Sequence, residues 1–314
     1  YWDTASGKEV SRFQAEPPGS HANLKLAPDG KLLAVHRVDR NAVHLWDAAT
    51  GKLLHKLESG HRGVYAVAFS LDGRMLATGY SDDLNVRVWE VATGKQITTF
   101  KLSSGWPWSL AFAPDGRSLA AGSSDTTALL FDVTGRAPSG QLPPARHTPQ
   151  ELESLWTALG AEDPAKAYPA VWGLIAAPEQ AVATLGNGLL VAERKRRLAL
   201  KWIGDLDAAQ FAVRDKAMKE LTALKVAAVP ALREALAGNL TLEARRRVEA
   251  LLAHASPTVS EPLRALRGVR ILEQIATAEA RRVLQTLARN DPETALAREA
   301  RAALARLDRH VTGR

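Results

Sequence analysis

Hydrophobic and polar residues alternate in short runs along the first part of the chain. Runs such as GVYAVAFS and NVRVWEV have a period of two, and Asp-Gly or Thr-Gly pairs bound them. Alternation over four to eight residues is typical of a strand with one buried face, and such pairs are typical of turns. The pattern therefore predicts a series of short antiparallel strands.

The strands recur as a repeat. The Asp-Gly turns fall at Asp29, Asp72 and Asp115, which are 43 residues apart each time. A second marker, an aromatic residue followed by an acidic one, recurs at a similar spacing at Trp2, Trp46, Trp89 and Phe131. Each repeat has room for about four strands, a sheet too small to bury its own faces. A period of about 40–45 residues that ends in Trp-Asp is the signature of a propeller blade.

The segment GHRGVYAVAFSLDGRMLATGYSDDLNVRVWE, residues 60–90, carries a family resemblance. With its neighbours it makes residues 1–142 similar to WD40-repeat proteins. The resemblance implies a buried, hydrogen-bonded network with a structural role, made of His61, Thr78, Asp82 or Asp83, and Trp89. A buried imidazole needs a partner at both nitrogens, and a carboxylate can supply one of them.

The neighbouring repeats depart from this pattern. In the third repeat, Phe131 replaces Trp, Ala121 replaces the hydroxyl residue, and SSGW stands where Gly-His is expected, so that Asp125 alone is retained. The first repeat keeps Asp39 and Trp46, but His21 is displaced relative to His61. We expect packing, more than a polar network, to hold these two blades.

The ring itself is expected to be incomplete. Known propellers have roughly four to eight blades, so three repeats cannot close one. The chain also opens on YWDTASGKEV, which reads as the end of a blade. The resemblance therefore implies about four further blades upstream.

Helical periodicity replaces the alternation in the second half. Residues 135–148 gather Pro, Gly and Ser, and Thr148 then precedes Pro149 and two acidic residues, which favours a helix start. We expect domains at 1–142 and 149–310, joined by a linker at 143–148. The predicted helices are 149–159, 164–177, 178–185, 192–203, 208–224, 227–236, 242–253, 261–275, 278–288 and 293–307.

Two helical stretches, FAVRDKAMKEL and AAVPALREAL, resemble HEAT-like repeats, and the likeness extends over about 205–307. An irregular helical bundle is the alternative. The predicted fold class is therefore multidomain, β plus α: a partial WD40 β-propeller of about three blades, followed by an all-α HEAT-like solenoid or helical bundle.

Composition excludes several kinds of catalytic and binding site. The chain of 314 residues has no cysteine, which excludes disulfides, thiolate nucleophiles and cysteine-bound zinc, and is consistent with a cytoplasmic location. No phosphate-binding loop, nucleophile elbow, zinc motif or calcium loop occurs, and the eight histidines have no metal-ligand spacing. We expect no catalytic site, no cofactor, no metal site and no membrane span.

Positive charge is concentrated in the second half. Residues 1–145 have 15 Lys/Arg against 14 Asp/Glu, whereas residues 146–314 have 26 against 20, within a net charge of +7. Basic runs such as ERKRRLALK could contact nucleic acid. In helices of this composition a solvated face explains them better.

The WD40 resemblance places four residues on the side of the blades that usually meets partners: Arg62, Tyr65, Trp106 and Trp108. Trp, Tyr and Arg dominate interface hot spots. One of the two Trp residues could instead pack under its blade in place of the missing His. We therefore expect a non-enzymatic scaffold that binds protein partners. The alternatives are a nucleic-acid-associated protein and the regulatory C-terminal part of a larger enzyme or signalling protein.

Overall fold

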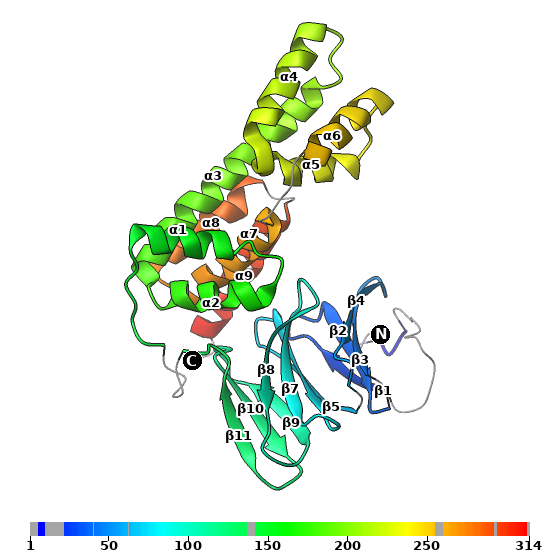
Figure 1. Ribbon diagram of the computed structural model, residues 1–314, viewed down its shortest axis with the longest axis vertical. Coiled ribbons are helices and arrows are strands. Elements are labelled where there is room, and N and C mark those ends of the chain that lie inside the picture. The colour runs from blue at the N-terminus through cyan, green and yellow to red at the C-terminus, as the bar shows by residue number, and fades with distance from the viewer. Residues whose placement is uncertain are drawn as a thin grey trace. The chain divides into compact units, whose positions relative to one another are not determined.

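The computed structural model describes residues 6–9, 22–39, 41–61, 63–136, 142–254, 260–291 and 294–312. Three antiparallel sheets are followed by a series of helices (Figure 1), so the predicted β plus α fold class is confirmed. Two compact units make up the chain. The sheet unit is Tyr1–Pro143 with Asp163–Pro169, and the helical unit is Pro144–Glu162 with Ala170–Arg314.

Each sheet follows the chain order of its strands. The first contains β1 (Ala22–Leu26), β2 (Leu32–Arg37), β3 (Ala42–Asp47) and β4 (Leu53–Glu58). The second contains β5 (Val64–Phe69), β6 (Met75–Tyr80), β7 (Asn85–Glu90) and β8 (Lys95–Lys101). The third contains β9 (Pro107–Phe112), β10 (Ser118–Ser123) and β11 (Ala128–Asp132). The outer strand expected next falls in part on residues 137–141, outside the described residues.

The recurrent Asp-Gly pairs form the turn after the first strand of each sheet. The carboxylate of Asp29 accepts the backbone N–H of Lys31 at 3.0 Å, and Asp72 and Asp115 accept equivalent bonds at 3.0 and 2.9 Å. The glycine after each Asp has a φ near +70°, a conformation that costs other residues energy. The 43-residue period of the sequence therefore comes from the same local turn, which recurs once in each sheet.

Apolar side chains join the first sheet to the second. Every residue of β6 is buried. The shared cluster contains Ala34, Val43, Leu45 and Leu57 from the first sheet and Val64, Val67, Leu76, Tyr80 and Trp89 from the second. Because each sheet is too small to enclose a core alone, stacking supplies the missing apolar surface.

The helices are α1 (Pro149–Ala158), α2 (Pro164–Ile175), α3 (Pro178–Asp205), α4 (Phe211–Leu224), α5 (Val229–Leu236), α6 (Leu242–His254), α7 (Glu261–Ile275), α8 (Ala278–Asn290) and α9 (Ala295–Thr312). Thr148 caps α1 through a capping box with Glu151, which confirms the helix start predicted there. Residues of α3 contact α1, α4, α5, α7 and α8 (Figure 1). The long helix α3 is thus the axis around which these five helices pack.

One helix prediction is wrong. Residues 178–185 and 192–203 belong to a single helix, α3, that runs through Gly186 and Gly188. A Cβ atom on Gly188 would lie 2.5 Å from Cη2 of Trp156, and one on Gly186 would lie 3.2 Å from Cγ2 of Val283. These glycines allow close packing of neighbouring helices rather than ending the helix.

Within the described residues, no single helix has both the length and the apolar composition of a membrane span. By that test alone, α2 and α3 pass as a pair bent by 120°.

Candidate functional site

Two loops of the second sheet meet at one end of it. The loop before β5 carries His61, and the β6–β7 turn carries Asp82 and Asp83. The backbone N–H of Ser81 donates to the carbonyl of Gly63 at 3.0 Å, which joins the two loops. The third sheet repeats this arrangement, since the N–H of Ser124 donates to the carbonyl of Trp106 at 2.9 Å.

The residues expected to form one buried network form two separate groups. The indole N–H of Trp89 donates to Oγ1 of Thr78 at 2.8 Å, in the buried interior. His61 lies instead beside the acidic turn, with Nε2 at 3.3 Å from Oδ2 of Asp83 and Nδ1 at 3.9 Å from Oδ1 of Asp82. The side chain of His61 is 44% exposed, so the expectation that it would be buried is not met.

Asp83 contacts Arg87 as well as His61. Its guanidinium donates to Oδ2 of Asp83 and lies over the ring of Tyr80, 4.7 Å from the centroid. Burial raises the pKa of Asp83, but hydrogen bonds from Arg87 and Asn85 outweigh burial and hold that pKa below its usual value. Asp83 is therefore ionised at neutral pH and already has a cationic partner.

The ligand atoms of His61, Asp82 and Asp83 all lie within 4.8 Å of one another, a spacing that a metal ion could bridge. The guanidinium of Arg87 is already paired with Asp83, and its positive charge disfavours the binding of a further cation. The cluster therefore gives no support for a metal site.

In the third sheet, Ser104 occupies the place that His61 has in the second. Its hydroxyl donates to Oδ2 of Asp125, and Thr127 donates to Oδ1 of the same carboxylate at 2.6 Å. These bonds hold the pKa of Asp125 well below its usual range. Sequence reasoning missed Ser104, although the alignment of SSGW with Gly-His at residues 60–61 pointed to its position.

Three of the four predicted partner-binding residues come together. The rings of Tyr65 and Trp108 meet edge to face with centroids 5.4 Å apart, and Trp106 lies 6.3 Å from each of them. Trp106 is 40% exposed and Trp108 is 56% exposed, so neither ring packs under the sheet in place of the missing His. We call Tyr65, Trp106 and Trp108 the aromatic cluster. Arg62 lies outside the described residues.

The backbone around Pro107 explains why both Trp rings face outward. Side chains alternate between faces along a strand, so Trp108 and Pro107, the first two residues of β9, take opposite faces. Pro107 is buried close to Gly79, where a Cβ atom would lie 2.5 Å from Cγ of the proline. Gly105, at a φ of +66°, leaves similarly little room, since its Cβ would lie 2.3 Å from Oγ of Ser123. Tight packing behind the loop thus fixes the exposed rings.

Comparison with known proteins finds a match to one part of the chain. No curated protein matches the chain. The family model of the WD domain, G-beta repeat, matches residues 51–90 and 94–132, which contain β4 of the first sheet and all strands of the second and third sheets. These two stretches of the sheet unit are therefore similar to WD40 repeats, and they carry all three residues of the aromatic cluster.

Proposed function

We propose that this protein is a non-enzymatic interaction scaffold and that the aromatic cluster is part of its contact surface for a protein partner. The observation that carries the proposal is the exposure of Trp106 and Trp108 against Tyr65. WD40 repeats are generally protein-interaction modules, which supports the same conclusion.

The cluster has the properties of an interface hot spot. Large aromatic rings bring much apolar area to a contact and lose little conformational freedom, and truncating one at a hot spot costs about 2 kcal/mol or more. Here one strand carries Tyr65, and the next sheet carries both Trp rings. The rings also pack on one another before any partner arrives, so binding would order few side chains.

The test is quantitative. A partner captured with the wild-type chain is purified, and its Kd is measured by calorimetry for the wild type, Trp106→Ala and Trp108→Ala. Each substitution is expected to weaken binding roughly 30-fold, which corresponds to about 2 kcal/mol. The control is Leu130→Ala, because Leu130 is 71% exposed on β11 but belongs to no aromatic contact. Unchanged affinity in both Trp variants, with unchanged melting curves, would refute the proposal.

For the helical unit, we propose a compact bundle around α3 that offers a second surface. In a solenoid, each repeat contacts only its neighbours in sequence. Helix α3 also packs against α7 and α8, which follow it by more than 50 residues. The hairpin formed by α8 and α9 resembles one HEAT repeat, but the contacts of α3 favour the bundle.

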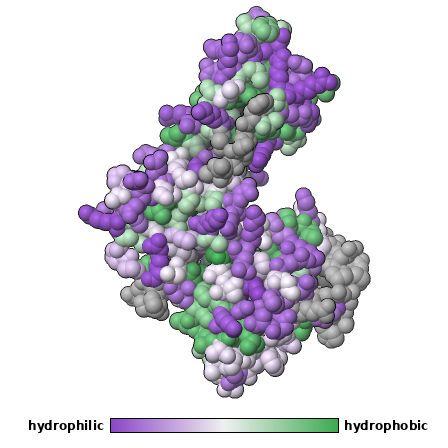
Figure 2. Space-filling view, in the orientation of Figure 1, coloured by the Kyte–Doolittle hydropathy of each residue, from purple (hydrophilic) through white to green (hydrophobic). Residues whose placement is uncertain are grey.

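Nucleic-acid binding is the second candidate function. Arg194, Lys195, Arg197 and Lys201 are exposed on α3, and hydrophilic side chains cover most of the end formed by α4 and α6 (Figure 2). Arg196, in the middle of the basic run, is however held by acidic side chains. A steep salt dependence of binding to heparin would support this candidate, and no retention at low salt would exclude it. A regulatory role for the chain within a larger enzyme stays a prediction.

A further inference from the structure

Two groups of helices pack on different halves of α3. The first group is α1, α7, α8 and α9, and in it Leu189 of α3 lies close to Gly268, and Gly186 lies close to Val283. The second group is α4, α5 and α6. Its core contains Ala199, Ile203, Leu206, Ala217, Leu221, Ala228, Ala231, Leu232, Ala244 and Val248. Within the described residues, the second group makes few contacts with α7, α8 and α9, so α3 is the main connection between the groups (Figure 1).

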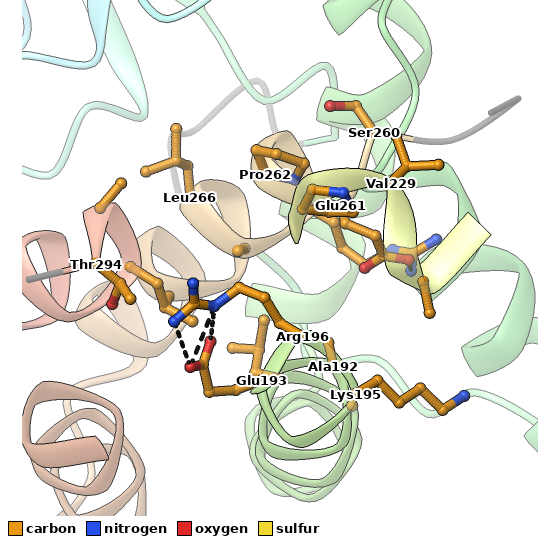
Figure 3. A pocket seen from close by; sticks show the side chains of 18 of the residues that line it. Ala192, Glu193, Lys195, Arg196, Val229, Ser260, Glu261, Pro262, Leu266 and Thr294 are labelled. Atoms are coloured by element: carbon orange, nitrogen blue, oxygen red, sulfur yellow. Dashed lines mark hydrogen bonds and ion pairs between the residues drawn. The ribbon is translucent and has the colours of Figure 1, made fainter. Parts of the chain in front are cut away.

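The part of α3 between the two groups is polar. Glu193 is the only buried residue of α3 between Leu189 and Ala199, a stretch that the structure describes in full. Nε of Arg196 donates to the two oxygens of Glu193 at 3.3 and 3.2 Å (Figure 3). A close-packed apolar contact cannot open without leaving a void, whereas charged groups that separate are solvated by water. The middle of α3 is therefore where the two groups can move apart most easily.

Arg196 also connects the two groups directly. Its Nη1 donates to Glu234 of α5 at 2.8 Å, and its Nη2 donates to Asp291, the C-cap of α8, at 2.5 Å. Three carboxylates thus surround one guanidinium. Without that positive charge the carboxylates would repel one another, and the repulsion would act between α5 and the end of α8. Arg196 therefore holds the second group against the first.

A cavity of about 680 Å³ lies beside these ion pairs. Its walls come from α5 of the second group, from α1, α7 and the start of α9 of the first group, and from α3 between them (Figure 3). Because both groups line the cavity, a change in the angle between them would change how widely it opens.

We propose that Arg196 is a clasp that keeps the helical unit closed, and that the second group swings on α3 when the clasp is released. Hinge motions of this kind need a conformational change in only a few residues. The two apolar cores stay intact, while the helical surface and the opening of the cavity change. Because the clasp consists of ion pairs, ionic strength controls its release.

Spin labels can measure the swing. The chain has no cysteine, so introduced cysteines are the only labelling sites. The test pair is Arg246→Cys on α6 with Gln285→Cys on α8, two exposed positions in different groups. Double electron–electron resonance on the full chain is expected to give one narrow distance distribution. Adding Arg196→Met should produce a second, longer component, with an open population at least about tenfold larger than in the wild type.

Two controls separate a swing from a general loosening. Glu153→Cys on α1 with Gln285→Cys on α8 is a pair within the first group, and its distribution should stay unchanged in Arg196→Met. Arg282→Met also removes one positive charge, but the ion pair of Arg282 is exposed and lies within α8. It should leave the distribution of the test pair unchanged.

Salt should act in opposite directions in the two proteins. Raising NaCl to about 1 M weakens the ion pairs of the wild type and should increase the longer component. In Arg196→Met, the same salt screens the repulsion among the carboxylates and should reduce that component. Equal responses to salt would overturn the electrostatic clasp.

A second variant keeps the test valid if Arg196→Met does not fold. Glu234→Gln changes a carboxylate that is 57% exposed and weakens one arm of the clasp, so it should produce a smaller longer component. Distributions of the test pair that match the wild type in every folded variant would overturn the proposal. So would a broadening of the control pair as large as that of the test pair.

Discussion

Gly188 of α3 lies against the six-membered ring of Trp156, so close that a Cβ atom on Gly188 would be 2.5 Å from Cη2. The contact joins α1 to α3 and explains why a glycine occupies the middle of a long helix. Gly204, in the same helix, has no atom within 4 Å of where its Cβ would be. The two glycines therefore make a matched pair.

We predict that Gly188→Ala and Gly204→Ala change stability in opposite directions. Alanine favours the helix at both sites, which should raise the free energy of unfolding of Gly204→Ala by about 0.5–1 kcal/mol. At Gly188 the clash with Trp156 should outweigh that gain, so Gly188→Ala should lower the free energy of unfolding by roughly 1–3 kcal/mol. Chemical denaturation measures both, and Gly188→Ala should cost far less in a Trp156→Ala background. Equal effects at the two positions would contradict this account.

We predict that the hydrogen bond between Trp89 and Thr78 in the second sheet couples the two residues energetically. Thr78→Val leaves the buried indole N–H without an acceptor, and Trp89→Phe leaves the hydroxyl without its donor, so each should destabilise the protein by about 1–3 kcal/mol. The double variant should cost less than the sum of the two, because it leaves neither group unpaired. A double-mutant cycle on thermal unfolding gives the coupling, and strict additivity would argue against the bond.

We predict that the ion pair of Arg306 contributes more to stability than an exposed ion pair does. Its Nε and Nη2 lie 2.6 and 2.9 Å from the two oxygens of Glu273, which ties α9 to α7 in a mostly buried setting. Arg306→Met should cost on the order of 3 kcal/mol, since a buried carboxylate loses its bidentate partner. Arg306→Met/Glu273→Leu should recover much of that loss.

Lys219→Met is the control for this prediction. It breaks an exposed pair with Asp215 on α4, where the separation is 2.7 Å, and should cost less than about 0.5 kcal/mol. If the two single variants, Arg306→Met and Lys219→Met, melted alike, burial would not be the source of the difference.

His36 should make the sheet unit less stable in mild acid. Burial lowers the pKa of this imidazole, and Nδ1 lies 3.0 Å from the carbonyl oxygen of Val64, at the start of the next sheet. Below about pH 6.5 the unfolded chain protonates His36 while the folded chain resists protonation, so stability falls as the pH falls. Melting temperatures at pH 7.5 and 5.5 should differ less in His36→Gln than in the wild type. His44, whose burial also lowers its pKa, should retain part of the slope. Identical slopes in the two proteins would refute the role of His36.

The sheets and most of the helices could be predicted from local sequence patterns. Asp-Gly turns and alternating strands are local features, because neighbouring residues supply both the hydrogen bond and the backbone preference. The capping box at Thr148 and Glu151 is local in the same sense, and its position was predicted correctly. The residues Tyr65, Trp106 and Trp108 could be selected from the resemblance to WD40 repeats and from residue type.

The contacts that these residues make depend on packing between elements far apart in the chain. The sequence predicts separate helices at 178–185 and 192–203, but Gly186 and Gly188 between them are points of close contact with Val283 and Trp156 within one helix. His61 read as a buried residue, but Arg87 takes part of the carboxylate that would have held it. A cavity of about 680 Å³ between α1, α3, α5, α7 and the start of α9 has no sequence signature, because its walls come from helices far apart in the chain. Local preference sets which elements form, and long-range packing and charge pairing set which side chains remain free to bind.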